Sequence, residues 1–529
     1  MHPVVTADLL LYGGLVGAQY LAPLLDPPCP KIEAIAISGS HILAVGTEND
    51  LRPFVTARTR RLSCAGHTIL PGFIDPHLHL FAWASRFCGA DLSRARSLAD
   101  LHAALVQRLP SLANGEWLRG YGYDEFFLAE KRHPTRHDLD AVSRNHPIIL
   151  RHRTGHAAVL NSAALQHARI DQHFVHQHFV PPGGGIVERE ASGEPTGVLY
   201  ELEGYLRTVI PPLPHTEFMA GVRQASSALL QQGVTSFHDA SAGNTLADVE
   251  IFQRLRSEGI LKPDATVMVG IAALPHLLAT KLTPFNNADR VRIGSIKIMV
   301  HEGRGEIYPP PEELREMVWQ VHRSGLQVAI HAVEEGAVWA ALDAIEHAQQ
   351  RLPRRDHRHR IEHCALCPPP LIEKLVETGS AVVTQPGFLY FYGEKYAAEI
   401  DPDIHEWLYR TKSLQARGIP VAGSSDCPIA PLAPFMSLQT AMTRQSRGGI
   451  VLSPQERLSL NEALPLFTLA GAWIGFAENS TGSISPGKRA DLVILDGDLS
   501  TTPTDAIHAL KVTTTIVGGE IVWSDSGGQ

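Results

Sequence analysis

Cysteine, charged residues and long hydrophobic runs are all scarce in this chain, and each scarcity excludes a class of protein. Only 6 of the 529 residues are cysteine, too few for the disulfide framework that small secreted domains use. We therefore expect reduced thiols and a cytoplasmic protein. Charged residues make up 19% and apolar residues 44% of the chain, a balance that excludes intrinsic disorder and allows a large core.

No apolar segment reaches the length of a membrane span, and no run of basic residues stands out. The formal net charge is −9, so neither a membrane nor nucleic acid is an expected partner. The apolar start of the chain has no Lys or Arg before Lys31. A secretory signal would carry positive charge ahead of its apolar segment, so none is expected here.

Histidine, by contrast, is unusually frequent, with 27 residues. Two of them, His77 and His79, lie in the stretch GFIDPHLHLF at residues 72–81. Residues two apart in a β-strand point to the same face of the sheet. These two imidazoles can therefore share one target, which could be a metal ion, a substrate or solvent.

The two ends of the chain differ from its middle. Residues 1–70 and the last 50 residues contain short strands and turns, with hairpins expected at 34–45 and 512–523. The segments ADLLLYGG at 7–14 and ADLVILDG at 490–497 resemble each other, which is compatible with both ends pairing in one sheet. We expect residues 1–70 and 477–529 to belong to one composite unit of β-structure.

Between residues 233 and 430, short β-rich runs alternate with longer helix-like segments, a pattern typical of βα units around a parallel sheet. With Ile69–Ile74 counted as the first strand, the runs number eight: 69–74, 233–237, 266–269, 296–300, 328–331, 360–363, 381–384 and 420–423. We predict a (β/α)8 barrel from residues 71–90 and 206–476. Residues 91–205 are predicted to be an α/β insertion after barrel strand 1 that covers the barrel mouth.

Potential metal ligands recur at the ends of these strands. Lys297 and His331 are 34 residues apart, His331 and His363 are 32 apart, and His363 and Asp426 are 63 apart. One βα unit takes roughly 30 residues, so each of these residues falls at a similar height in a different strand. Active sites of such barrels lie at the carboxyl ends of the strands, and we expect all of these side chains to converge there with His77 and His79.

Four histidines and one aspartate in one place indicate a metal site. Imidazole and carboxylate ligands suit zinc, the first expectation, and also iron, manganese or nickel. Lys297 has two possible uses. It could pair with a carboxylate, or its amine could react with carbon dioxide to form a carbamate that bridges two metal ions. The sequence thus predicts one or two divalent ions.

Four stretches, in this order, resemble the amidohydrolase superfamily: Leu70–His79, Ile361–Cys364, Gly423–Asp426 and Gly482–Leu492. The segment Gly155–Leu165 resembles the amidohydrolase 3 (YtcJ-like) family in particular. The resemblance spans nearly the whole chain. It implies a barrel with a small β-sandwich built from both chain ends, which agrees with the pattern of the termini. It also makes a homodimer a family-level expectation.

The resemblance implies that His77, His79 and Asp426 hold one metal, and that His331 and His363 hold a second, bridged by carboxylated Lys297. A metal-activated hydroxide would attack the substrate, with Asp426 as the general base that passes a proton to the leaving amine. Residues 299–303 and 332–336 depart from common family patterns, and these departures concern the metal count and the substrate pocket.

The predicted function is hydrolysis of a non-peptide C–N bond in a small-molecule amide, formamide or cyclic amide. Two alternatives remain: a deaminase or ester hydrolase of the same superfamily, and a non-catalytic regulatory relative. Such a relative usually lacks a ligand, whereas the set here is complete. The stretch 356–360 is expected to be a polar loop. Further candidates for substrate contact are His156, His238, Gln385, Glu302 and Tyr123.

Overall fold

The largest sheet of the described structure has eight parallel strands. The computed structural model describes residues 5–16, 32–171, 185–280, 282–303 and 305–525. Within them, the strand order in this sheet follows the chain: β7 (Phe73–Leu78), β14 (Val234–Asp239), β15 (Asp264–Gly270), β16 (Val291–Met299), β19 (Val328–Ala332), β20 (Arg360–His363), β21 (Ala381–Thr384) and β22 (Val421–Gly423). The predicted barrel fold is confirmed.

The first and last strands of this sheet approach each other and nearly close the barrel. The backbone N–H of Asp426 donates to the carbonyl oxygen of His77 at 2.8 Å. The N–H of Ser425 lies 3.2 Å from both carboxylate oxygens of Asp75. These contacts bring the segment after β22 against the carboxyl end of β7, and they place Asp426 beside the two histidines of the first strand.

Gly72 divides the predicted first strand into two strands of different sheets. Residues 68–71 form β6, which pairs with β23 (Leu492–Leu495) of the terminal domain, and β7 begins only at Phe73. A Cβ atom at Gly72 would lie 2.2 Å from Oγ1 of Thr235, so the close approach of β14 admits only glycine here. The strand that carries His77 therefore starts later than the sequence pattern predicts.

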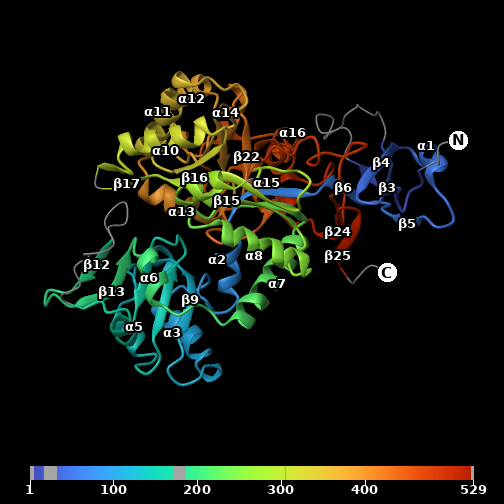
Figure 1. The fold of residues 1–529 in the computed structure, drawn as a ribbon. Helices are drawn as coiled ribbons and strands as arrows, with labels where there is room; N and C mark the ends of the chain where they lie inside the picture. The colour runs from blue at the N-terminus through green and yellow to red at the C-terminus, as the bar shows by residue number, and fades with distance from the viewer. Residues whose placement is uncertain (1–4, 17–31, 172–184, 281, 304, 526–529) are drawn as a thin grey trace. The chain divides into compact units, whose positions relative to one another are not determined.

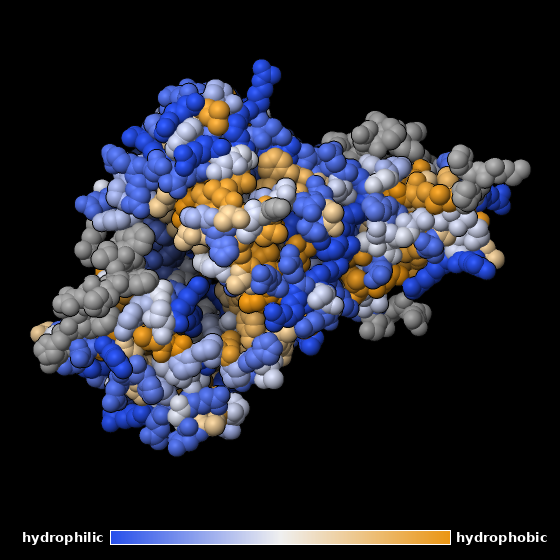
Figure 2. All heavy atoms as spheres, in the orientation of Figure 1, coloured by the Kyte–Doolittle hydropathy of each residue, from blue (hydrophilic) through white to orange (hydrophobic). Residues whose placement is uncertain are grey.

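Amphipathic helices lie between the barrel strands: α8 (Leu246–Ser257), α10 (Pro311–Arg323), α11 (Glu335–Arg351) and α12 (Pro369–Thr378). Helix α12 shows why such segments form. It begins with proline at its first position and ends at Gly379 in the left-handed conformation, with φ of 64°. It buries Leu371, Ile372 and Leu375. The face over α10, α11 and α12 in Figure 2 is mainly hydrophilic, as expected for helices that bury one side only.

Both ends of the chain build a two-sheet sandwich. One sheet has the order β4-β3-β1-β5, and the other β2-β6-β23-β24-β25. The strands not yet given are β1 (Leu9–Tyr12), β2 (Leu15–Val16), β3 (Ala34–Ser38), β4 (His41–Gly46), β5 (Arg60–Ser63), β24 (Val512–Val517) and β25 (Glu520–Ser524). Both predicted hairpins form, and Figure 1 shows the blue and red strands close together.

One hydrophobic cluster joins the two sheets of the sandwich. It contains Leu9, Ile35 and Ile37 from the first sheet, and Ile494 and Ile516 from the second. Both chain ends do pair in one sheet, as expected, through β6 and β23. The two similar segments, 7–14 and 490–497, nevertheless face each other across this core, since β1 and β23 belong to different sheets.

Residues 80–225 form a second compact unit, together with residues 427–430. Its six-stranded sheet has the order β12-β13-β11-β10-β9-β8, and helices such as α3 (Leu98–Val106) and α5 (Ser162–His167) belong to it. The unit is wider at both ends than the predicted insertion 91–205, because α2 (Leu80–Arg86) and most of α7 (His215–Gln231) group with it.

Two further sequence expectations can be compared with the described residues. No helix among them is long and apolar enough to cross a membrane. None of the cysteines that the structure describes forms a disulfide bond: Cys64, Cys88, Cys364, Cys367 and Cys427.

Candidate metal centre

The carboxyl ends of the barrel strands bring the predicted ligands together. His77 lies near the end of β7, Lys297 in β16, His331 in β19, and His363 at the end of β20. His79 directly follows β7, and Asp426 is the third residue after β22. Because parallel strands around a barrel end at the same rim, residues far apart in sequence meet there. Lys297, His77, His363 and Asp426 are all buried.

His77, His79 and Asp426 form one group. The Nε2 atoms of His77 and His79 lie 3.5 Å and 3.1 Å from Oδ1 of Asp426. Potential ligand atoms of the three residues all lie within 4.8 Å of one another. Burial by itself would raise the pKa of Asp426, but the neighbouring histidines outweigh burial and hold this pKa below its usual range.

His363 links this group to His331. Nε2 of His363 lies 3.0 Å from Nδ1 of His331, and the ring centroids of His363 and His77 are 4.9 Å apart. On its other side, Nδ1 of His363 contacts Oε1 of Gln385 at 2.8 Å. The four histidines and Asp426 are therefore one continuous cluster.

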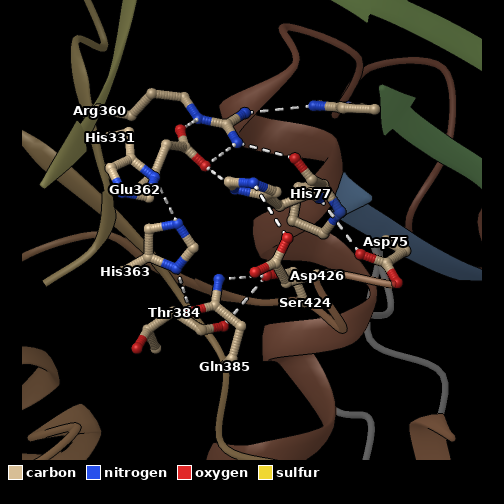
Figure 3. A network of polar contacts seen from close by, with 12 residues as sticks. Asp75, His77, His331, Arg360, Glu362, His363, Thr384, Gln385, Ser424 and Asp426 are labelled. Carbon is tan, nitrogen blue, oxygen red and sulfur yellow. Dashed lines mark hydrogen bonds and ion pairs between the residues drawn. The ribbon is translucent and has the colours of Figure 1, made fainter. Parts of the chain in front are cut away.

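Glu362 and Arg360 are buried partners of this cluster that the sequence analysis did not single out. Oε2 of Glu362 accepts from Nδ1 of His77 at 2.5 Å, and its two oxygens accept from Nε and Nη2 of Arg360 at 2.5 Å and 2.9 Å. Figure 3 shows Glu362 between these two side chains. Arg360 and Glu362 lie two apart in β20, whose sequence is RIEH. This spacing was the available signal, because residues two apart in a strand point to the same side of the sheet.

These contacts fix where the protons lie on two of the histidines. Burial by itself would raise the pKa of Glu362, but Arg360, His77 and Lys297 together outweigh burial and hold this pKa well below its usual range. This carboxylate therefore only accepts hydrogen bonds, and Nδ1 of His77 carries the proton. The amide oxygen of Gln385 likewise requires the proton of His363 to be on Nδ1. Both rings therefore present a lone pair at Nε2 to the interior of the cluster.

This donor set fits a cation. The lone pair of His77 Nε2 and the carboxylate of Asp426 repel each other at 3.5 Å unless positive charge lies between them. Oδ1 of Asp426 is buried and accepts no hydrogen bond among the described residues. An arrangement of imidazole nitrogens and a carboxylate that face one another without a shared proton is the chemistry of a divalent metal site.

Lys297 is fully buried beside this cluster. Its Nζ atom has no hydrogen-bond partner in the described part of the chain, which is rare for a buried ammonium group. Burial lowers the pKa of Lys297 to about 8, so the neutral amine is accessible near neutral pH. The residue thus does not form the carboxylate pair that was one of its two predicted uses.

The backbone at two of these residues is strained. His363 and Asp426 have φ of 73° and 55°, in the left-handed region that residues other than glycine seldom adopt. Such strain costs roughly 1–3 kcal/mol per residue and concentrates at functional sites. The strained backbone at these two residues therefore lowers stability while it directs their side chains into the cluster.

The other residues proposed for substrate contact have varied surroundings. His238 is in register with Thr266 of β15, which is in register with Arg292 of β16, on the amino-terminal side of Lys297. Nδ1 of His238 lies 3.2 Å from Nη1 of Arg360. Gln385 is buried between His363 and Ser424. The carboxylate of Glu302 accepts from the backbone N–H of Gly336 at 3.1 Å.

His156 and Tyr123 belong to the second compact unit. His156 lies half-exposed, with Nδ1 2.8 Å from Oε1 of Glu201. Tyr123 is buried, and its hydroxyl group contacts Nδ1 of His133 at 3.0 Å. Neither of these contacts involves a residue of the barrel.

Comparison with known proteins shows the family of this chain. A model of the amidohydrolase family matches residues 62–523. The chain belongs to this family. The protein YtcJ of Bacillus subtilis (strain 168) is 27% identical over 525 residues, covering 94% of this chain and 97% of YtcJ. The N-substituted formamide deformylase of Arthrobacter pascens is 28% identical over 528 residues, covering 94% of this chain and 95% of the deformylase.

Solved structures give the same picture for the fold of this amidohydrolase. An uncharacterized metal-dependent hydrolase from Pyrococcus horikoshii OT3 superposes with a TM-score of 0.73 at 22% identity, covering 94% of this chain and 98% of that one. The family resemblance and the barrel that it implied are thus confirmed. The chain is a member of the amidohydrolase family and carries a group of residues able to hold a metal ion.

Proposed function

We propose that this amidohydrolase hydrolyses a non-peptide C–N bond in a small amide, formamide or cyclic amide. The observation that carries the proposal is the buried donor set, in which the Nε2 lone pair of His77 faces the carboxylate of Asp426 at 3.5 Å. The similarity to an N-substituted formamide deformylase over nearly the whole chain supports the choice of bond.

In this proposal His77, His79 and Asp426 hold one divalent metal ion, with zinc as the first expectation. His331 and His363 would hold a second ion, and carboxylated Lys297 would be a further ligand of the centre. The buried amine without a hydrogen-bond partner supports this use of Lys297. When bound, the metal would supply Lewis-acid activation of water and of the substrate carbonyl.

Asp426 acts as the general base. Its buried carboxylate oxygen Oδ1, which accepts no hydrogen bond in the described structure, can take a proton from the attacking water and give it to the leaving amine. Its backbone N–H is held by the carbonyl oxygen of His77 at 2.8 Å. This contact fixes the carboxylate relative to the first strand, so the proton acceptor does not depend on a mobile loop.

Glu362 and Gln385 act as positioning residues. Each accepts the Nδ1 proton of a histidine, which fixes the ring orientation and leaves Nε2 as the donor. The buried location of Gln385 supports this role better than direct contact with a substrate. Arg360 in turn supplies the positive charge that allows Glu362 to stay ionised in the barrel interior.

The test is an assay of a panel of N-formyl amines, N-acyl amines and cyclic amides, with formate, acid and ammonia measured separately. We expect metal-dependent formation of an amine and a carboxylic acid, which remain on one molecule when a cyclic amide is opened. In the variant Asp426→Asn, turnover should fall by 10²-fold or more, the loss typical of a missing general base. Near-normal turnover would contradict the role of Asp426, and full activity in metal-free protein would contradict the hydrolytic mechanism.

Glu456→Gln is a matched control. Glu456 is also a buried carboxylate, but it accepts from the backbone N–H of Ser413 at 2.9 Å and pairs with Arg410, away from the cluster. Its substitution should lower stability and leave turnover nearly unchanged. Release of ammonia from an amino-substituted ring, without amide cleavage, would instead indicate a deaminase.

A further inference from the structure

A second cluster of potential metal ligands lies in the compact unit 80–225. Strands β9 (Leu118–Tyr123) and β10 (Ile148–His152) run parallel, with Tyr123 in register with His152. Asp124 and Glu125 directly follow β9, and His152 ends β10. The carboxyl ends of neighbouring parallel strands thus bring two carboxylates and an imidazole to one edge of this sheet, as they do in the barrel.

The donor atoms of this cluster are close to one another. Nε2 of His152 lies 2.9 Å from Oε2 of Glu125 and 3.7 Å from Oδ1 of Asp124. Potential ligand atoms of the three residues lie within 4.8 Å of one another. A fourth donor, Nε2 of His133, lies 3.7 Å from the same Oε2 of Glu125. The separations are similar to those in the group of His77, His79 and Asp426.

His152 is the residue that points to a ligand. Its side chain is only 6% exposed, and its buried Nε2 makes no hydrogen bond of acceptable geometry in the described structure. The other ring nitrogen, Nδ1, is 2.8 Å from Oγ1 of Thr154. The contact with Thr154 therefore fixes the orientation of the ring, and the buried Nε2 points to the carboxylates of Asp124 and Glu125.

Charge and access also suit a cation. Asp124 and Glu125 contribute two negative charges, of which Arg153 offsets one through its contact with Oδ2 of Asp124. Asp124 is buried, whereas the side chains of Glu125 and His133 are 25% and 19% exposed. An ion could therefore enter from the side of Glu125. Tyr123, through its contact with Nδ1 of His133, would orient that ring.

We propose that Asp124, Glu125 and His152, with His133 as a fourth donor, bind a divalent first-row transition-metal ion. Mixed carboxylate and imidazole donors favour Zn²⁺, Mn²⁺ or Co²⁺ over the purely oxygen-liganded Mg²⁺ and Ca²⁺. This site shares no residue with the barrel cluster and does not depend on the hydrolytic function proposed above. It assigns Tyr123 to the support of a metal ligand.

The test measures Co²⁺ binding to the full-length chain after chelator treatment, by metal analysis and by visible absorption of bound Co²⁺. The parent variant His77→Ala/Asp426→Ala removes two barrel ligands, so that the second cluster dominates the signal. Adding His152→Ala should remove one equivalent of Co²⁺. Adding His137→Ala should remove none, because His137 is an exposed histidine of the same unit that contacts Glu190.

If His152→Ala does not fold, the variant Glu125→Gln can be tested in its place, because the amide has the same shape as the carboxylate. It should weaken Co²⁺ binding at least tenfold while the far-ultraviolet circular dichroism stays unchanged. An unchanged Co²⁺ content in folded His152→Ala, or an unchanged affinity in Glu125→Gln, would overturn the proposal. The cluster would then be a metal-free network in which His152 contacts Glu125.

Discussion

Replacing Glu362 by glutamine tests how the barrel holds its histidine cluster. The carboxylate makes three charged hydrogen bonds, two to Arg360 and one to His77, at 2.5–2.9 Å. In Glu362→Gln one oxygen becomes an NH2 group. Whichever way the amide turns, that group faces an N–H of Arg360, and in one of the two orientations also that of His77, so a buried donor meets a buried donor.

The structure sets the expected magnitude. Both side chains of the Arg360–Glu362 pair are fully buried, and removing one partner of such a pair typically costs about 3–5 kcal/mol, because a buried charge loses its counter-charge. A metal ligand that loses its supporting hydrogen bond typically binds metal about 10–100-fold more weakly. We therefore expect both losses in Glu362→Gln.

Urea unfolding of chelator-treated protein measures the first loss, and competition with a calibrated chelator measures the second. The control is Glu478→Gln, which weakens the partly exposed pair of Arg358 and Glu478 and should cost about 1 kcal/mol or less. An unfolding free energy within about 1 kcal/mol of the wild type, together with unchanged metal affinity, would refute the role assigned to Glu362.

Three further predictions concern Lys297, the buried His357 and Gly72. Lys297→Met should lower the metal content per chain, as measured by metal analysis, and an unchanged content would exclude the carbamate bridge. Burial lowers the pKa of His357 to about 4, so the folded protein requires the neutral form of this ring. The free energy of unfolding should therefore be highest above about pH 6.5 and should fall as the pH drops toward 4. The loss should be at most about 3 kcal/mol. Urea unfolding should show this loss, and His357→Gln should reduce the slope. Gly72→Ala should cost about 3 kcal/mol from its overlap with Thr235, whereas Gly303→Ala, which meets nothing within 4 Å, should be nearly neutral in thermal unfolding.

His357 and His359 show what the sequence pattern left out. The stretch 356–359 is the expected polar loop before β20, yet His357, His359 and Arg360 are buried. His359 Nε2 lies 2.8 Å from Nδ1 of His322, whose Nε2 donates to the carbonyl oxygen of Leu352 at 2.7 Å. Polar residues between a helix and a strand usually remain solvated. Here a chain of mutual hydrogen bonds makes their burial possible, and no local pattern reveals such partners.

The sequence by itself determined the elements and their order. Alternating β-rich and helical segments predicted eight parallel strands, and potential ligands one or two βα units apart predicted that four histidines, a lysine and an aspartate would meet at one rim. This inference was possible because the strand period and the length of a βα unit are local properties of the chain. The family resemblance rested on short motifs that can be read in the same way.

Only the tertiary structure decided the contacts that give these residues their chemistry. The ion pair of Arg360 and Glu362, the proton positions on His77 and His363, and the isolation of Lys297 depend on which side chains face one another across the barrel. The division of the first strand at Gly72 depends on the close approach of Thr235, which lies 163 residues further along the chain. Such long-range distances and the exclusion of water are set by packing, and no window of sequence contains them.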